Sequence, residues 1–87
     1  MWSEEVIPLE AGRNTRTAYV RVLRPDNLPS LTWAMDKAAT DLEEEVRAAA
    51  RRQRMVAEPI GPVTFTVRTV PPFDYVLATG SWLVSPR

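Results

Sequence analysis

One long run of residues at helical spacing, bounded by prolines, constrains the fold of this chain more than any other feature. Between residues 30 and 56, the side chains on one side of a helix recur every three or four positions and fall within roughly an 80° arc. They are Leu31, Met35, Ala38, Leu42, Val46, Ala49, Gln53 and Val56. Pro29 precedes the run and Pro59 follows it. The spacing predicts one amphipathic helix from about Ser30 to Val56, roughly 39 Å long, with one apolar face to bury.

The charges along this run support the same helix. Residues 36–45 hold five acids and one base, and residues 47–54 hold four arginines and no acid. This order complements the helix dipole, whose amino end is positive and whose carboxyl end is negative. Opposite charges four residues apart, such as Lys37 and Asp41, each add roughly 0.2–0.5 kcal/mol to helix stability.

Shorter segments on both sides of the helix alternate between apolar and polar residues, as half-buried strands do. This pattern predicts strands over residues 16–23 and 63–70. The two prolines in residues 71–74 indicate a four-residue hairpin loop, and a last strand is expected over residues 75–84. We interpret the Gly80-Ser81 pair as a bend or a bulge within that last strand.

The last strand is apolar on both faces, which makes it the most informative of the strands. One face carries Tyr75, Leu77 and Leu83, and the other carries Val76, Ala78, Trp82 and Val84. A strand of this kind is covered on both sides, but a single helix covers one face of a small sheet. The N-terminal arm with Trp2 and Ile7, a second copy of the chain, or a partner protein is therefore expected on the second face.

Together these elements predict an α+β fold. We expect a small antiparallel sheet of three or four strands with one long amphipathic helix packed on one face, in the order (β)βαββ. Residues 1–87 form a single domain. Residues 1–10 are either an N-terminal arm or an edge strand, because Pro8 lacks an amide hydrogen and restricts such a strand to the edge of a sheet.

Composition excludes several classes of chemistry. The 87 residues include no Cys and no His, and 11 basic and 11 acidic residues give a net charge of zero. Disulfides, thiolate nucleophiles and histidine bases are therefore excluded, and there is no general attraction to nucleic acid or anionic lipid. No apolar run approaches the ~20 residues of a membrane span, and the acidic N-terminus does not resemble a signal peptide. We expect a cytoplasmic protein without membrane association.

No residues combine into a catalytic, cofactor-binding or metal-binding site. Ser81 has no histidine to act as its base and only part of the nucleophile-elbow pattern around it. Asp41 and Glu45 are spaced to share a hard cation such as Mg²⁺, but we interpret them as part of a solvated acidic helix face. The three scattered glycines build no phosphate-binding loop. The sequence favours a non-catalytic protein over an enzyme.

We predict a non-catalytic protein–protein interaction module that forms a homo-oligomer. Ten arginines against one lysine are typical of a GC-rich coding sequence, and are compatible with a small phage or accessory protein that acts on a host protein. Trp33 is the first candidate contact because it lies about 180° from the centre of the apolar stripe, and Trp and Arg are enriched in interface hot spots. The predicted contact residues are Trp33, Arg47, Arg51, Arg54, Phe73 and Trp82.

The alternative function is association with nucleic acid. Arg47, Arg51 and Arg54 lie on one helical face with Arg52 beside them, and arginine is well suited to phosphate contacts. The five acids of the same helix and the zero net charge make this the second hypothesis.

Overall fold

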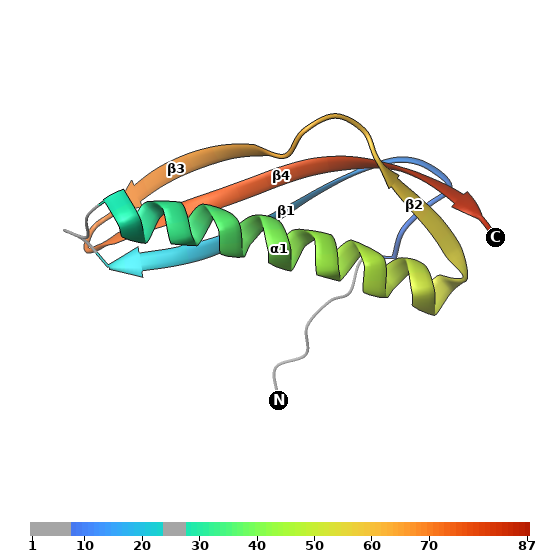
Figure 1. Cartoon of the computed structure of the whole chain (residues 1–87), viewed down its shortest axis with the longest axis horizontal. Coiled ribbons are helices and arrows are strands. Elements are labelled where there is room, and N and C mark those ends of the chain that lie inside the picture. Colours follow the sequence, from blue (N-terminus) through green and yellow to red (C-terminus); the bar gives the residue numbers. More distant parts are fainter. Residues whose placement is uncertain (1–7, 24–27) are drawn as a thin grey trace.

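A computed structural model describes residues 8–23 and 28–87 of the chain. One long helix packs along one side of an antiparallel sheet (Figure 1), which confirms the predicted α+β class. The elements follow the order β-α-β-β-β: β1 (Gly12–Leu23), α1 (Leu28–Gln53), β2 (Met55–Pro59), β3 (Thr64–Val70) and β4 (Phe73–Pro86).

The 14-residue strand β4 is the centre of the sheet. On one edge it pairs with the whole of β1, from Gly12 opposite Val84 to Leu23 opposite Phe73. On its other edge β3 pairs with the first half of β4 and β2 pairs with the second half. Figure 1 shows β3 and β2 following each other along this edge, joined by a loop. The register between β1 and β4 runs without interruption through Gly80 and Ser81, so the predicted bulge at this pair is wrong.

The strand β2 was not predicted, because the helical stripe was extended to Val56. The helix ends at Gln53 instead, since Arg54 adopts a left-handed backbone conformation with φ of 54°. The chain then turns back to pair with the end of β4, where the amide of Arg87 donates to the carbonyl oxygen of Arg54 at 3.2 Å. Val56 consequently lies opposite Ser85 in the sheet rather than on the helix.

Two other local predictions also need correction. Val70 pairs directly with Phe73, so the hairpin loop consists of Pro71 and Pro72 rather than four residues. The described part of the N-terminal segment, residues 8–10, is not a strand, and its remainder lies outside the described residues.

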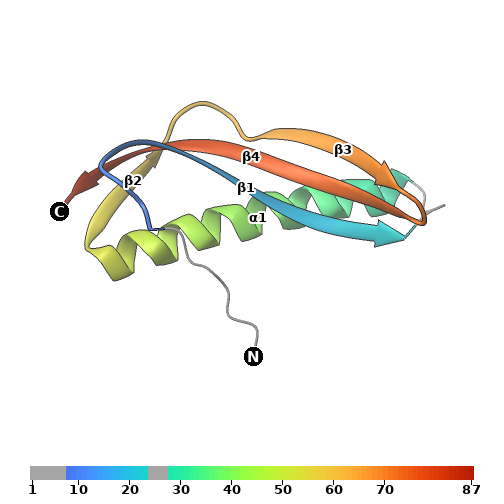
Figure 2. The same ribbon diagram turned by 180° about the vertical axis from the view of Figure 1, so that it is seen from behind.

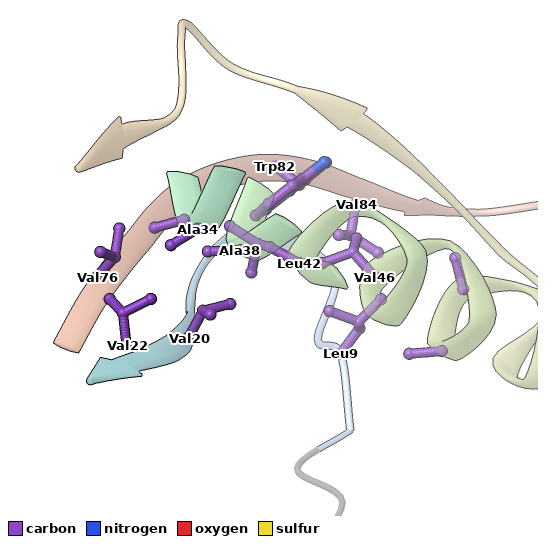
Figure 3. Packing of buried hydrophobic residues seen from close by; sticks show 13 residues of the cluster. Leu9, Val20, Val22, Ala34, Ala38, Leu42, Val46, Val76, Trp82 and Val84 are labelled. Atoms are coloured by element: carbon purple, nitrogen blue, oxygen red, sulfur yellow. The ribbon is translucent and has the colours of Figure 1, made fainter. Parts of the chain in front are cut away.

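The core lies between α1 and the sheet face formed by alternate residues of β1 and β4 (Figure 3). Small side chains on both surfaces let the helix approach the sheet closely, with Ala34 and Ala38 on α1 and Ala78 on β4, all fully buried. Larger residues then fill the space around them, and the cluster comprises Leu9, Val20, Val22, Ala34, Ala38, Leu42, Val46, Ala49, Ala50, Val76, Ala78, Trp82 and Val84.

The segment at residues 8–10 belongs to this helix side of the sheet. Leu9 is buried in the core, and its backbone is held at both polar atoms by the Gln53 side chain. The Leu9 amide donates to Gln53 Oε1 at 2.8 Å, and Gln53 Nε2 donates to the Leu9 carbonyl oxygen at 3.0 Å. Asn14 makes the equivalent pair of bonds to the backbone of Glu10, at 3.1 and 2.7 Å. The described part of the N-terminal segment therefore does not lie on the opposite face of the sheet.

Candidate interaction surface

The sheet has one face under the helix and one face without a covering layer in the described part of the chain. Alternation along β4 places Val76, Ala78 and Trp82 under α1, and places Tyr75 and Leu77 on the opposite side. We call that opposite side the outer face. Figure 2 shows the sheet from behind, with α1 along one side only. The outer face comprises Arg13, Thr15, Thr17, Tyr19, Arg21 and Leu23 of β1, Val56 and Glu58 of β2, Thr64, Thr66, Arg68 and Val70 of β3, and Phe73, Tyr75, Leu77, Thr79, Ser81 and Leu83 of β4.

The half of the outer face next to the β3–β4 hairpin is aromatic. Tyr19 and Tyr75 have ring centroids 5.9 Å apart, and Phe73 meets Tyr75 edge-on at 6.4 Å. The Arg21 guanidinium carbon lies 4.3 Å from the centroid of the Phe73 ring, which is the geometry of a cation–π contact. Tyr19 nevertheless remains 66% exposed. Aromatic side chains of this kind supply a large contact area at a low cost in side-chain entropy, because they rotate about two bonds only.

The other half of the outer face is built from hydroxyl groups that satisfy one another across the strands. The Thr15 and Ser81 hydroxyls are 3.0 Å apart, as are those of Thr17 and Thr79. The Thr64 hydroxyl donates to the Thr79 carbonyl oxygen at 3.4 Å. Hydroxyl pairs of this kind cost less to remove from water than unpaired groups do, because their hydrogen bonds are already made.

Charged side chains lie at the margins of this face rather than along its centre. The central strand β4 presents no charged residue outward from Phe73 to Leu83. The charges belong to the flanking strands, with Arg13 and Arg21 on β1, Arg68 on β3 and Glu58 on β2. An uncharged central strand with charged residues on the strands beside it matches the depletion of charge at the core of protein–protein interfaces.

The residues predicted as partner contacts do not form one surface. Trp33 points outward as predicted and is 56% exposed. Arg47, Arg51 and Arg54 are also exposed, and Arg47 is 3.8 Å from Glu43. Trp33 and Arg47 are 14 positions apart on the helix, about 21 Å along its axis, so they do not contact each other. The association of these arginines with nucleic acid stays a prediction.

Of the two predicted contacts on β4, one lies on the outer face and the other does not. Phe73 is half-buried there, between Arg21 and Tyr75. Trp82 is 5% exposed and lies in the core (Figure 3), so its prediction as a partner contact is wrong. Its indole covers the site where Gly80 has no side chain: a Cβ at Gly80 would lie 2.7 Å from Trp82 Cη2. The bare backbone of Gly80 is therefore the reason that the ring fits under the helix.

Tyr19, Tyr75 and Leu77 lie within the strands predicted over residues 16–23 and 75–84 but are not among the predicted contacts. The signal that identifies them is the strand register, which sets the Tyr19 side chain beside Leu77 and the Arg21 side chain beside Tyr75. Alternation within one strand does not reveal this, because it does not say which strands are neighbours.

A shallow groove of about 540 Å³ follows the free edge of β1. Thr17, Ala18 and Tyr19 line one side, and three carboxylates of α1 line the other: Asp41, Glu44 and Glu45. Asp41 is already paired with Lys37 at 3.3 Å. Within residues 8–23 and 28–87, no group of three or more acidic side chains is arranged to hold a metal ion, and every buried side-chain nitrogen or oxygen has a hydrogen-bond partner.

No protein-family model matches the chain, and neither curated proteins nor solved structures show significant similarity to it. Over the described residues, α1 lacks the sustained apolar stretch with which a helix crosses a lipid bilayer.

Proposed function

We propose that this chain is a non-catalytic protein–protein interaction module that self-associates through the outer face of its sheet. The observation that carries the proposal is the uncovered outer face. It exposes Tyr19, Leu23, Val70 and Leu83, each by more than half of its surface. Among the described residues, α1 is the one helix available to cover the two sides of the sheet.

The size of the outer face fits a second copy of the chain. Fourteen residues of β4 extend about 46 Å, and three strand positions span about 14 Å, which gives about 600 Å² in projection. The accessible area exceeds this projection because the side chains stand up from the sheet. Stable interfaces take about 600–1,000 Å² from each partner, so this surface reaches the lower end of that range when two copies are placed face to face.

The distribution of charge also favours a second copy. A two-fold axis places the same patch of both copies in contact, so a charged centre would repel itself. The centre of this patch, along β4, carries aromatic, aliphatic and hydroxyl side chains only. The charged residues of this face lie on the strands β1, β2 and β3 instead. The resulting layers would be helix, sheet, sheet and helix, with the two sheets about 10 Å apart.

Sedimentation equilibrium of the wild-type chain and of a Tyr19→Glu variant tests the proposal. Tyr19 is the most exposed aromatic residue of the outer face, so the substitution leaves the core unchanged and introduces a charge into the contact. We expect the wild-type chain to associate at micromolar concentration, and the variant to associate at least tenfold more weakly, about 1.4 kcal/mol.

Trp33→Glu is the matched control, because Trp33 is an aromatic residue of similar exposure on the far side of α1. It should leave association unchanged. A wild-type chain that stays monomeric at ~100 μM, where even a weak specific dimer is detectable, would rule out self-association. A loss of association in the Trp33 variant alone would move the contact to the helix.

A further inference from the structure

The strand β3 differs from the rest of the sheet in having no covered face. Each of its seven residues is exposed, and none belongs to the core cluster. The helix α1 packs on β1, β4 and β2, while in Figure 3 the core side chains gather away from β3. Phe65 and Val67 lie opposite Ala78 and Val76, so they point to the helix side of the sheet. There they remain 37% and 50% exposed.

The strand β3 also lacks most of the sequence features that keep an edge strand from pairing with another chain. It contains no proline, one charged residue, and six Thr, Val or Phe residues, which favour strands. In the described residues β3 pairs with β4 on one edge only, so alternate N–H and C=O groups of its other edge have no strand partner. Natural edge strands are usually blocked by several charges, by a bulge or by a covering segment, and β3 has only Arg68.

The opposite edge of the sheet is protected in the ways that β3 is not. Strand β1 contains three charged residues, Arg13, Arg16 and Arg21. The groove beside it is lined by the carboxylates of Asp41, Glu44 and Glu45. A two-fold axis at this edge would bring those carboxylates close to the same groups of a second copy, so pairing through β1 is opposed by like charges.

We infer that the free edge of β3 pairs with β3 of a second copy, antiparallel and centred on Val67, so that one sheet runs continuously through both copies. In this register Val67 lies opposite itself, Thr66 opposite Arg68, and Phe65 opposite Thr69. No pair brings like charges together. Seven opposed residues supply about six to eight backbone hydrogen bonds, and the apolar residues on the helix side of both copies form one shared patch.

This inference deepens the proposed self-association, on which it rests, by adding a contact that uses different residues. The axis of the edge contact is perpendicular to the sheet, and the axis of the outer-face contact lies in the plane between two sheets. Where these two perpendicular two-fold axes intersect, they generate a closed tetramer with D₂ symmetry. Loss of the outer-face contact should leave a dimer joined at β3, and loss of the β3 contact should leave a dimer joined at the outer face.

Oxidative cross-linking of single-cysteine variants tests the register. The chain has no cysteine of its own, so Val67→Cys introduces the only thiol. Opposed residues of paired strands have Cα atoms about 4.5–5.5 Å apart, which is within disulfide range. Thr64→Cys is the control, because three residues from the axis its two copies are about 20 Å apart. Under mild oxidation we expect the Val67 variant to form covalent dimer at least tenfold more than the control, and to do so also when combined with Tyr19→Glu.

A second pair of variants keeps the test independent of thiol chemistry. Val67→Lys and Val67→Glu each set like charges against each other at the axis, so each alone should lose the β3 contact. An equal mixture should regain it as a heterodimer that weakens with added salt.

Equal cross-linking at residues 64 and 67 would overturn the register, and so would an absence of cross-linking in a chain that still associates through Tyr19. Cross-linking at residue 67 in a chain whose association ignores Tyr19→Glu would support the edge contact and refute the outer-face contact.

Discussion

Gly80 offers the most demanding test of the packing described above. The Trp82 side chain lies over the Gly80 backbone on the helix side of β4, where both residues are buried. An added methyl group would sit 2.7 Å from Trp82 Cη2 and 3.0 Å from Cζ3, and 3.5 Å from Leu42 Cδ2. Carbon atoms do not approach this closely, so either the indole or the strand must move in a Gly80→Ala variant.

Two opposing contributions set the size of the effect. Overpacking a well-packed core costs about 1–3 kcal/mol. Replacing glycine by alanine restricts the unfolded chain and returns about 0.4–1 kcal/mol. The net destabilisation is therefore about 1–2 kcal/mol, which corresponds to a fall in Tm of about 5–15 °C for a domain of this size.

Thermal and urea unfolding at one fixed protein concentration measure this effect. Ser81→Ala is the control, since it changes the adjacent residue on the outer face and removes only the exposed contact with Thr15. It should cost less than about 1 kcal/mol. A Trp82→Phe change should destabilise the wild-type chain, and should cost less when Gly80→Ala is already present, because the smaller ring relieves the clash. Such a coupling is expected only for residues in contact.

Two results would refute this reasoning. A Gly80→Ala variant as stable as the wild-type chain would mean that the indole has room to move. Strictly additive effects of the Gly80 and Trp82 substitutions would mean that the two residues do not compete for the same space.

Two further predictions concern the core and the N-terminal segment. Leu42→Ala should lower the free energy of unfolding by about 2–5 kcal/mol in urea titrations of dilute protein, because the Leu42 side chain of α1 is fully buried against the sheet. Leu83→Ala on the exposed outer face should cost less than about 1 kcal/mol in the same titrations. Equal losses would contradict the assignment of the two sheet faces. Gln53→Ala removes both hydrogen bonds to the Leu9 backbone, so hydrogen exchange of the Leu9 amide should accelerate by about tenfold or more. Arg52→Ala is the control, because it should leave this amide protected. An unchanged exchange rate in the Gln53 variant would show that burial of Leu9 alone holds the segment.

The single helix and the strands around it were predictable because their signals are local. A helical period follows from 3.6 residues per turn and a strand period of two follows from the pleat. The helix predicted over residues 30–56 and the strands predicted over 16–23, 63–70 and 75–84 therefore overlap α1, β1, β3 and β4, although their bounds differ from the observed ones. The apolar character of both faces of β4 was visible for the same reason.

The site was less predictable, because it depends on which strands are neighbours. The aromatic half of the outer face brings together Tyr19 and Tyr75, which are 56 residues apart in sequence and 5.9 Å apart between ring centroids. Trp33 is recognisable as an outward-facing residue from the helical pattern alone. The larger aromatic group of Tyr19, Phe73 and Tyr75 is divided between β1 and β4. Only the register of β1 against β4 brought it together.

The amino-acid pattern alone specifies the amphipathic surfaces of this chain, namely one apolar helix stripe and one strand with two apolar faces. The tertiary structure decided which surfaces meet. Alternation is symmetric with respect to the two faces, so it does not show that the face with Ala78, Gly80 and Trp82 receives the helix. That choice depends on steric fit, because the alanines of α1 approach closely only where β4 is also small, and the indole fills the remaining space. Likewise Val56 lies in a strand although it fits the helical pattern. Pairing β2 with the end of β4 satisfies backbone groups of both segments, whereas another helical turn would satisfy only those of the helix.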